Sequence, residues 1–189
     1  ALGIDPMLVS AFNQKAMLHC AAGRFDEARN VLGTTVFGDN YPIELATRRA
    51  IILAEEGDVK AALNEMLNVT ELEPDYFPAW QMIADWCGGV DNLQELYMRA
   101  AHNMTRLEPQ YHIAWGYLAE AHLGEGNKGE AKTHLEQALR LSPDYTYAAG
   151  LLLDLHLEAE EFDEAISVVE TVAPHVSGVA RLSKLIEIE

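Results

Sequence analysis

A period of about 34 residues constrains this chain more than any other feature of its sequence. Trp80 and Trp115 each follow an alanine, and Pro74, Pro109 and Pro143 return at the same interval. A period of this length is typical of proteins built from stacked repeats, in which each unit leaves an apolar face that its neighbour must cover. The units are counted from Val9, Ile43, Phe77, His112 and Thr146, which are 34, 34, 35 and 34 residues apart.

Small residues occupy two fixed places in these units. The eighth place carries Ala16, Ala50, Ala84 and Ala119, and the twentieth carries Ala28, Ala62, Ala131 and Ala165. Alanine at both places allows two antiparallel helices to approach closely, and a larger side chain would overpack them. Gly23, Gly57 and Gly126 fall at the turn between the helices, where glycine easily adopts a left-handed backbone. Asp26, Asp58 and Asn127 stand where they would cap the second helix or lead into it.

These columns resemble the tetratricopeptide repeat family. The resemblance is carried by W-x2-I-A-x2-C at Trp80–Cys87 and W-x2-L-A-x2-H at Trp115–His122, followed by Ala131, Ala138 and Pro143. It implies an all-α fold, a right-handed superhelical solenoid of antiparallel helix pairs. About five units would lie between partial units at both ends, the last beginning near residue 180. The third unit departs from the family pattern at Cys87–Asp91, where one residue is inserted.

We expect residues 1–189 to form one solenoid domain that belongs to a longer protein. Its formal net charge of −17, from 30 acidic and 13 basic residues, repels phosphate backbones and anionic lipid headgroups. This charge argues against nucleic acid and membrane surfaces as partners, and it favours a basic or neutral protein or peptide. The alternative is that the acidic surface only maintains solubility. No apolar stretch is long enough to span a bilayer, and a cytoplasmic location is expected.

Catalytic and cofactor motifs are missing from the sequence. It contains no G-x-x-x-x-G-K, no G-x-S-x-G and no H-E-x-x-H, so we expect no enzyme activity, no cofactor and no metal. His19, His122 and His156 share the eleventh place of their units, where a packing role is expected. Cys20 and Cys87 are expected to be free thiols.

The family resemblance also implies which residues face the concave groove, namely the second, fifth, ninth and twelfth or thirteenth places of each first helix. No lysine or arginine occupies these places, so the carboxylate clamp of chaperone-binding members is not expected. Candidate groove residues at these places, outside the two groups below, are Glu44, Gln81 and Glu158.

Two groups of groove residues are of special interest. Asp85, Glu120 and Asp154 share the ninth place and would form an acidic ladder that receives basic side chains of a partner. The alternative is that these carboxylates are solvated or pair with nearby arginines. Gly116 and Gly150 recur at the fifth place, where glycine costs about 1 kcal/mol relative to alanine. They reflect either close packing with the next helix or, together with Ile113 and Tyr147, a shallow apolar pocket for a ligand.

The function that follows from these observations is that of a non-catalytic interaction scaffold, which binds a protein or peptide in an acidic concave groove. The alternative is a regulatory or substrate-presenting arm of a larger enzyme, for example a transferase. A third reading is homo-oligomerisation through exposed repeat ends.

Overall fold

The computed structural model describes residues 5–38 and 40–175, and in this part of the chain the regular structure is entirely helical. The partial unit predicted from residue 180 lies outside the described residues. The contacts divide the chain into two compact units, Ala1–Trp86 and Cys87–Glu189, which are described separately below. The predicted class, an all-α solenoid of antiparallel helix pairs, is confirmed, whereas the count of one domain stays a prediction.

The first unit begins with two helical hairpins. Helix α1 pairs with α2, and α3 pairs with α4. Helix α3 also packs against both α1 and α2. Its helices are α1 (Pro6–Ala21), α2 (Phe25–Leu32), α3 (Ile43–Glu55), α4 (Val59–Leu72) and α5 (Phe77–Cys87), which ends at the junction.

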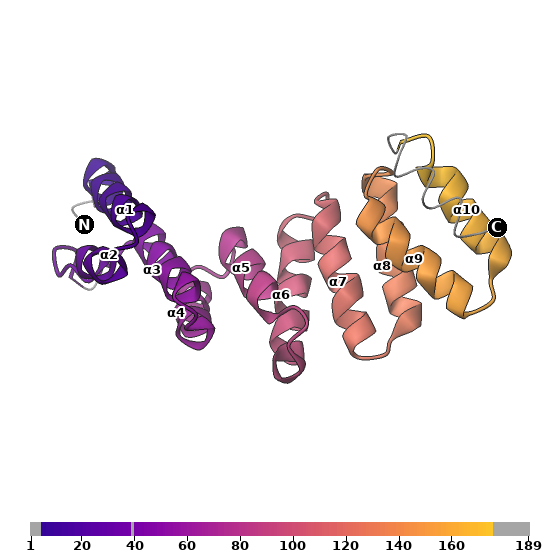
Figure 1. Cartoon of the computed structure of the whole chain (residues 1–189), viewed down its shortest axis with the longest axis horizontal. Helices are drawn as coiled ribbons and strands as arrows, with labels where there is room; N and C mark the ends of the chain where they lie inside the picture. The colour runs from indigo at the N-terminus through magenta and orange to yellow at the C-terminus, as the bar shows by residue number, and fades with distance from the viewer. Residues whose placement is uncertain (1–4, 39, 176–189) are drawn as a thin grey trace. The chain divides into compact units, whose positions relative to one another are not determined.

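In the second unit each described α-helix contacts the next one along the chain, and the hairpins α7–α8 and α9–α10 are plainly visible (Figure 1). A short 3-10 turn, η1 (Asp91–Leu93), precedes the helices α6 (Gln94–Leu107), α7 (His112–Gly124), α8 (Lys128–Leu141), α9 (Thr146–Glu158) and α10 (Phe162–Val172). The helices α3, α5, α7 and α9 begin at four of the residues from which the period was counted, and α1 begins three residues before Val9.

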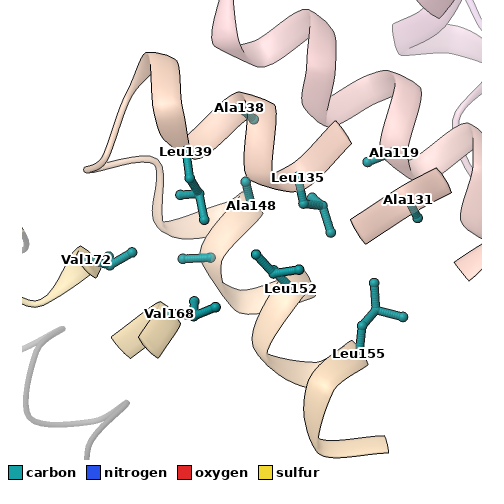
Figure 2. Packing of buried hydrophobic residues seen from close by; sticks show 11 residues of the cluster. Ala119, Ala131, Leu135, Ala138, Leu139, Ala148, Leu152, Leu155, Val168 and Val172 are labelled. Carbon is teal, nitrogen blue, oxygen red and sulfur yellow. The ribbon is translucent and has the colours of Figure 1, made fainter. Parts of the chain in front are cut away.

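The alanine columns form the closest contacts of the core. Ala119 and Ala131 have no exposed surface, so α7 and α8 meet there without an intervening side chain (Figure 2). Leu135 and Leu152 fill the adjoining space between α8 and α9, and Val168 closes it from α10. Burying each such leucine contributes about 2 kcal/mol.

The turns between paired helices need a left-handed backbone, as the sequence predicts. Gly23, Gly57 and Gly126 adopt φ values of +69°, +90° and +78°. In the fifth repeat the same place is occupied by Glu160, which adopts φ +59° without being glycine. The predicted helix starts are correct in part, because Asp58 accepts a bond from Ala61 N whereas Asn127 precedes α8 without capping it.

The recurring tryptophans and prolines are joined by a hydrogen bond. The indole Nε1 of Trp80 donates to the carbonyl oxygen of Pro74 at 2.7 Å, and that of Trp115 donates to Pro109 at 2.9 Å. Each tryptophan therefore ties the start of a repeat to the end of the preceding one.

The third repeat departs from the pattern at its second helix. Counting 34 residues back from Ala131 gives Tyr97, so a large aromatic side chain stands where other repeats carry alanine. Tyr97 is only 4% exposed, and its ring meets the edge of Tyr117 with centroids 6.2 Å apart. Its hydroxyl reaches Glu120, the one acidic residue of α7.

Candidate functional site

The carboxylate of Glu120, at a predicted groove place, accepts hydrogen bonds from two tyrosines. Tyr97 of α6 donates its hydroxyl to Glu120 Oε2 at 2.9 Å, and Tyr147 of α9 donates to the other oxygen. Burial, with a further contribution from Glu120, raises the pKa of both tyrosine hydroxyls well above the ordinary value for tyrosine. Both hydroxyls therefore remain donors, and they hold the carboxylate of α7 in one orientation.

A hollow of about 460 Å³ opens beside this carboxylate, and we call it the Glu120 recess. Its walls are apolar at Val90, Leu123 and Leu151, and its acidic groups are Asp91 and Glu120. Among the described residues, no lysine or arginine forms an ion pair with either of these two carboxylates. The remaining lining residues are Gly89, Gln94, Tyr97 and Gly124.

One end of the recess depends on a glycine. Gln94 Nε2 donates to the carbonyl oxygen of Ala121 at 2.6 Å, which lays the glutamine side chain across α7. A Cβ at Gly124 would lie 2.4 Å from that nitrogen, so any larger residue would displace Gln94. Gly124 therefore makes room for the amide that joins α6 to α7.

The three carboxylates of the predicted acidic ladder have different surroundings. Asp85 is exposed on α5 in the first unit and has an interaction of its own, and Asp154 is exposed on α9 in the second. Of the three carboxylates, Glu120 is the one that lines the recess. A ladder running through all three stays a prediction.

At Gly116 the chain itself packs closely, whereas the apolar ligand pocket of Ile113, Gly116, Tyr147 and Gly150 stays a prediction. A Cβ at Gly116 would lie 2.8 Å from the hydroxyl of Tyr145, the residue that precedes α9. The space at Gly116 thus serves packing with the next repeat. Gly150 is buried and Ile113 is half-buried, whereas Tyr147 remains 47% exposed above its bond to Glu120.

Two acidic groups near the turn of the fifth repeat, Glu158 and Glu161, differ from those of the recess, because each pairs with a lysine of the chain. Lys128 Nζ lies 2.6 Å from Glu158, one of the predicted groove residues. Glu161 pairs with Lys132 and lies 2.6 Å from His156 Nδ1, and these contacts lower the pKa of Glu161. These carboxylates already have cationic partners.

Groove places in the first unit line two further hollows, of about 630 and 280 Å³. Glu44 is exposed and lines one of them together with Tyr41, whereas Gln81 lines neither and is half-buried on α5. The other hollow contains Arg48, whose Nε donates to Asn13 Oδ1 at 2.9 Å. Arg48 stands at the sixth place of its repeat, so counting only the expected groove places missed this cation.

The eleventh-place histidines are packing residues in the second unit. His122 stacks on His134 with centroids 5.1 Å apart, and its ring meets the edge of His102 at 6.2 Å. No cluster of three or more His, Cys, Asp or Glu side chains in the described part of the chain has an arrangement that could hold a metal. Nor is any described helix both long and apolar enough to cross a membrane.

Comparisons with known proteins agree with this architecture. Residues 122–186 match the sequence profile of the tetratricopeptide repeat. A crystal structure of MamA has a TM-score of 0.73 at 14% identity and covers 98% of both chains. MamA from Desulfovibrio magneticus RS-1, beginning at its residue 41, has a TM-score of 0.70 at 16% identity over 95% of this chain and 93% of its own.

A thermophilic TPR protein of Thermus thermophilus has a TM-score of 0.58 at 17% identity and covers 95% of this chain and 96% of its own. No curated protein matches the sequence. At these identities the structural likeness concerns the fold. The resemblance to the tetratricopeptide repeat family is therefore confirmed, in sequence over residues 122–186 and in fold over most of the chain.

Proposed function

We propose that the chain is a non-catalytic scaffold that binds a basic or neutral polypeptide on its acidic groove face. Repeat solenoids of this family are interaction modules, and the fold supports a role in protein–protein contact. The observation that carries the proposal is the Glu120 recess, whose two carboxylates have no cationic partner among the described residues although acids elsewhere do. A polypeptide that supplied positive charge there would replace the missing counter-charge.

Charge governs the expected binding in two measurable ways. Opposite charges accelerate encounter and fix orientation, so affinity should rise with the positive charge of the partner. The same attraction should weaken as salt shortens the Debye length. A hydrophobic contact would respond to salt in the opposite direction.

The test is fluorescence anisotropy of the full chain with labelled, unstructured short peptides that differ only in net charge. We expect the cationic peptides to bind, and binding to weaken between about 50 and 300 mM NaCl. The triple variant Asp85→Lys, Glu120→Lys and Asp154→Lys should lose this binding. Equal affinity for cationic and anionic peptides, or no binding of either, would contradict the proposal.

A matched variant controls for the change in overall charge. Glu27→Lys, Glu136→Lys and Glu170→Lys alter the net charge by the same amount, and all three residues are exposed on second helices. This control should retain most of the affinity, because its substitutions lie away from the predicted groove places. A loss equal to that of the groove variant would show that only the overall charge matters.

A further inference from the structure

We infer that the Glu120 recess receives one arginine side chain of the polypeptide partner. This inference rests on the proposed function and assigns its anchoring contact. The recess is formed within the second unit by the η1 turn, α6, α7 and α9. The one-residue insertion at Cys87–Asp91 shifts the sequence register of the following helix, so Tyr97 stands where other repeats carry alanine, and its hydroxyl bonds to Glu120 of α7.

The lining of the recess matches the two halves of an arginine side chain. Leu123 and Leu151 offer apolar surface on which the methylene groups of the side chain would pack. Asp91 and Glu120 offer negative charge to the guanidinium at its end. An acidic or purely apolar side chain would leave these carboxylates without a counter-charge.

The tyrosine bonds favour a guanidinium over an ammonium group. Each Glu120 oxygen accepts one tyrosine hydroxyl, and each retains a second acceptor position. Both oxygens are thus oriented before binding, and a planar guanidinium can bond to two such oxygens at once. Lysine carries its charge on a compact, strongly hydrated ammonium and lacks this fork.

The inference is tested with a cationic peptide that contains a single arginine, together with its lysine and citrulline forms. Citrulline retains the shape of arginine without its charge. We expect the arginine form to bind the full chain about tenfold more tightly than the citrulline form, with lysine in between. In Glu120→Gln the preference for arginine over citrulline should disappear.

A second variant guards against a folding defect. Asp91→Asn lies in the exposed η1 turn and should reduce the same preference without altering the helices. Glu136→Gln removes an exposed carboxylate from α8 and should leave the preference unchanged. Thermal unfolding of every variant shows whether the fold is retained.

The outcomes distinguish failure of the arginine contact in the Glu120 recess from failure of the proposed binding function. If all peptide forms bind but the ratio of arginine to citrulline affinity is the same in Glu120→Gln and Asp91→Asn as in the unaltered chain, the arginine binds elsewhere and the anchor is overturned. The scaffold proposal would survive that result. If no cationic peptide binds the unaltered chain, both proposals fall.

Discussion

At the scale of single residues, the turn between paired helices has the same left-handed backbone in the fourth and fifth repeats, although the residue at that place differs. The turn of the fourth repeat uses Gly126 at φ +78°, and the turn of the fifth uses Glu160 at φ +59°. A left-handed conformation costs an L-residue with a Cβ about 1–2 kcal/mol. The fifth repeat therefore carries backbone strain that the fourth does not.

The substitution Glu160→Gly should consequently stabilise the protein by about 1 kcal/mol, measured as the free energy of unfolding in urea. The matched change is Gly126→Ala, which places a Cβ where no atom lies within 4 Å and so isolates the backbone cost. It should destabilise by a similar amount. A lower stability of Glu160→Gly would show that the turn is held by contacts of the glutamate instead.

At the scale of helix pairs, the alanine column determines how closely α7 and α8 pack. Ala131→Leu should lower the free energy of unfolding by about 1–3 kcal/mol, because Ala131 is fully buried and a larger side chain must push the helices apart. Thr133→Leu adds bulk to an exposed position on the same helix and should have little effect. Equal effects of the two in urea unfolding would mean that α8 is not closely packed.

The histidines that join α6, α7 and α8 predict a dependence on pH. Burial, followed by the nearby His122, lowers the pKa of His134, while Glu130 acts in the opposite direction and His102 adds to the lowering. Because the unfolded chain then takes up the proton more readily than the folded one, stability is complete above about pH 6.5 and declines below it.

We therefore expect the urea concentration at the midpoint of unfolding to decrease as the pH is lowered from about 7.5 to 5.5. The decrease should be smaller in the variant His134→Gln. The comparison isolates His134 from His19 and His156, which both proteins retain. An identical decline in the two proteins would place the sensitivity elsewhere.

What could be predicted from the sequence follows from what the repeats share. The alanine columns, the turn glycines and the starts of the first helices recur in most of the repeats, so the period reveals them. The bonds from Tyr97 and Tyr147 to Glu120 each join two neighbouring repeats, occur at a single place in the repeat series and depend on individual rotamers. The fifth-place glycines predict close packing as one of two alternatives, but the alignment does not predict that Tyr145 is the residue that packs on Gly116.

At the scale of the whole molecule, the net charge of −17 should act on folding and on the proposed binding in opposite directions. Excess charge of one sign destabilises a compact state through self-repulsion, and exposed ion pairs such as Lys128–Glu158 offset this only slightly. Added salt screens the repulsion, so the melting temperature should rise between about 50 and 300 mM NaCl.

Peptide affinity should fall over the same range of salt, because screening also weakens attraction between the acidic face and a cationic partner. Differential scanning calorimetry and anisotropy at matched salt concentrations measure the two responses. Sucrose provides a control, since it stabilises the fold without screening charge and should leave peptide affinity nearly unchanged. A melting temperature that fell with salt would mean that favourable ion pairs outweigh the self-repulsion of the 30 acidic side chains.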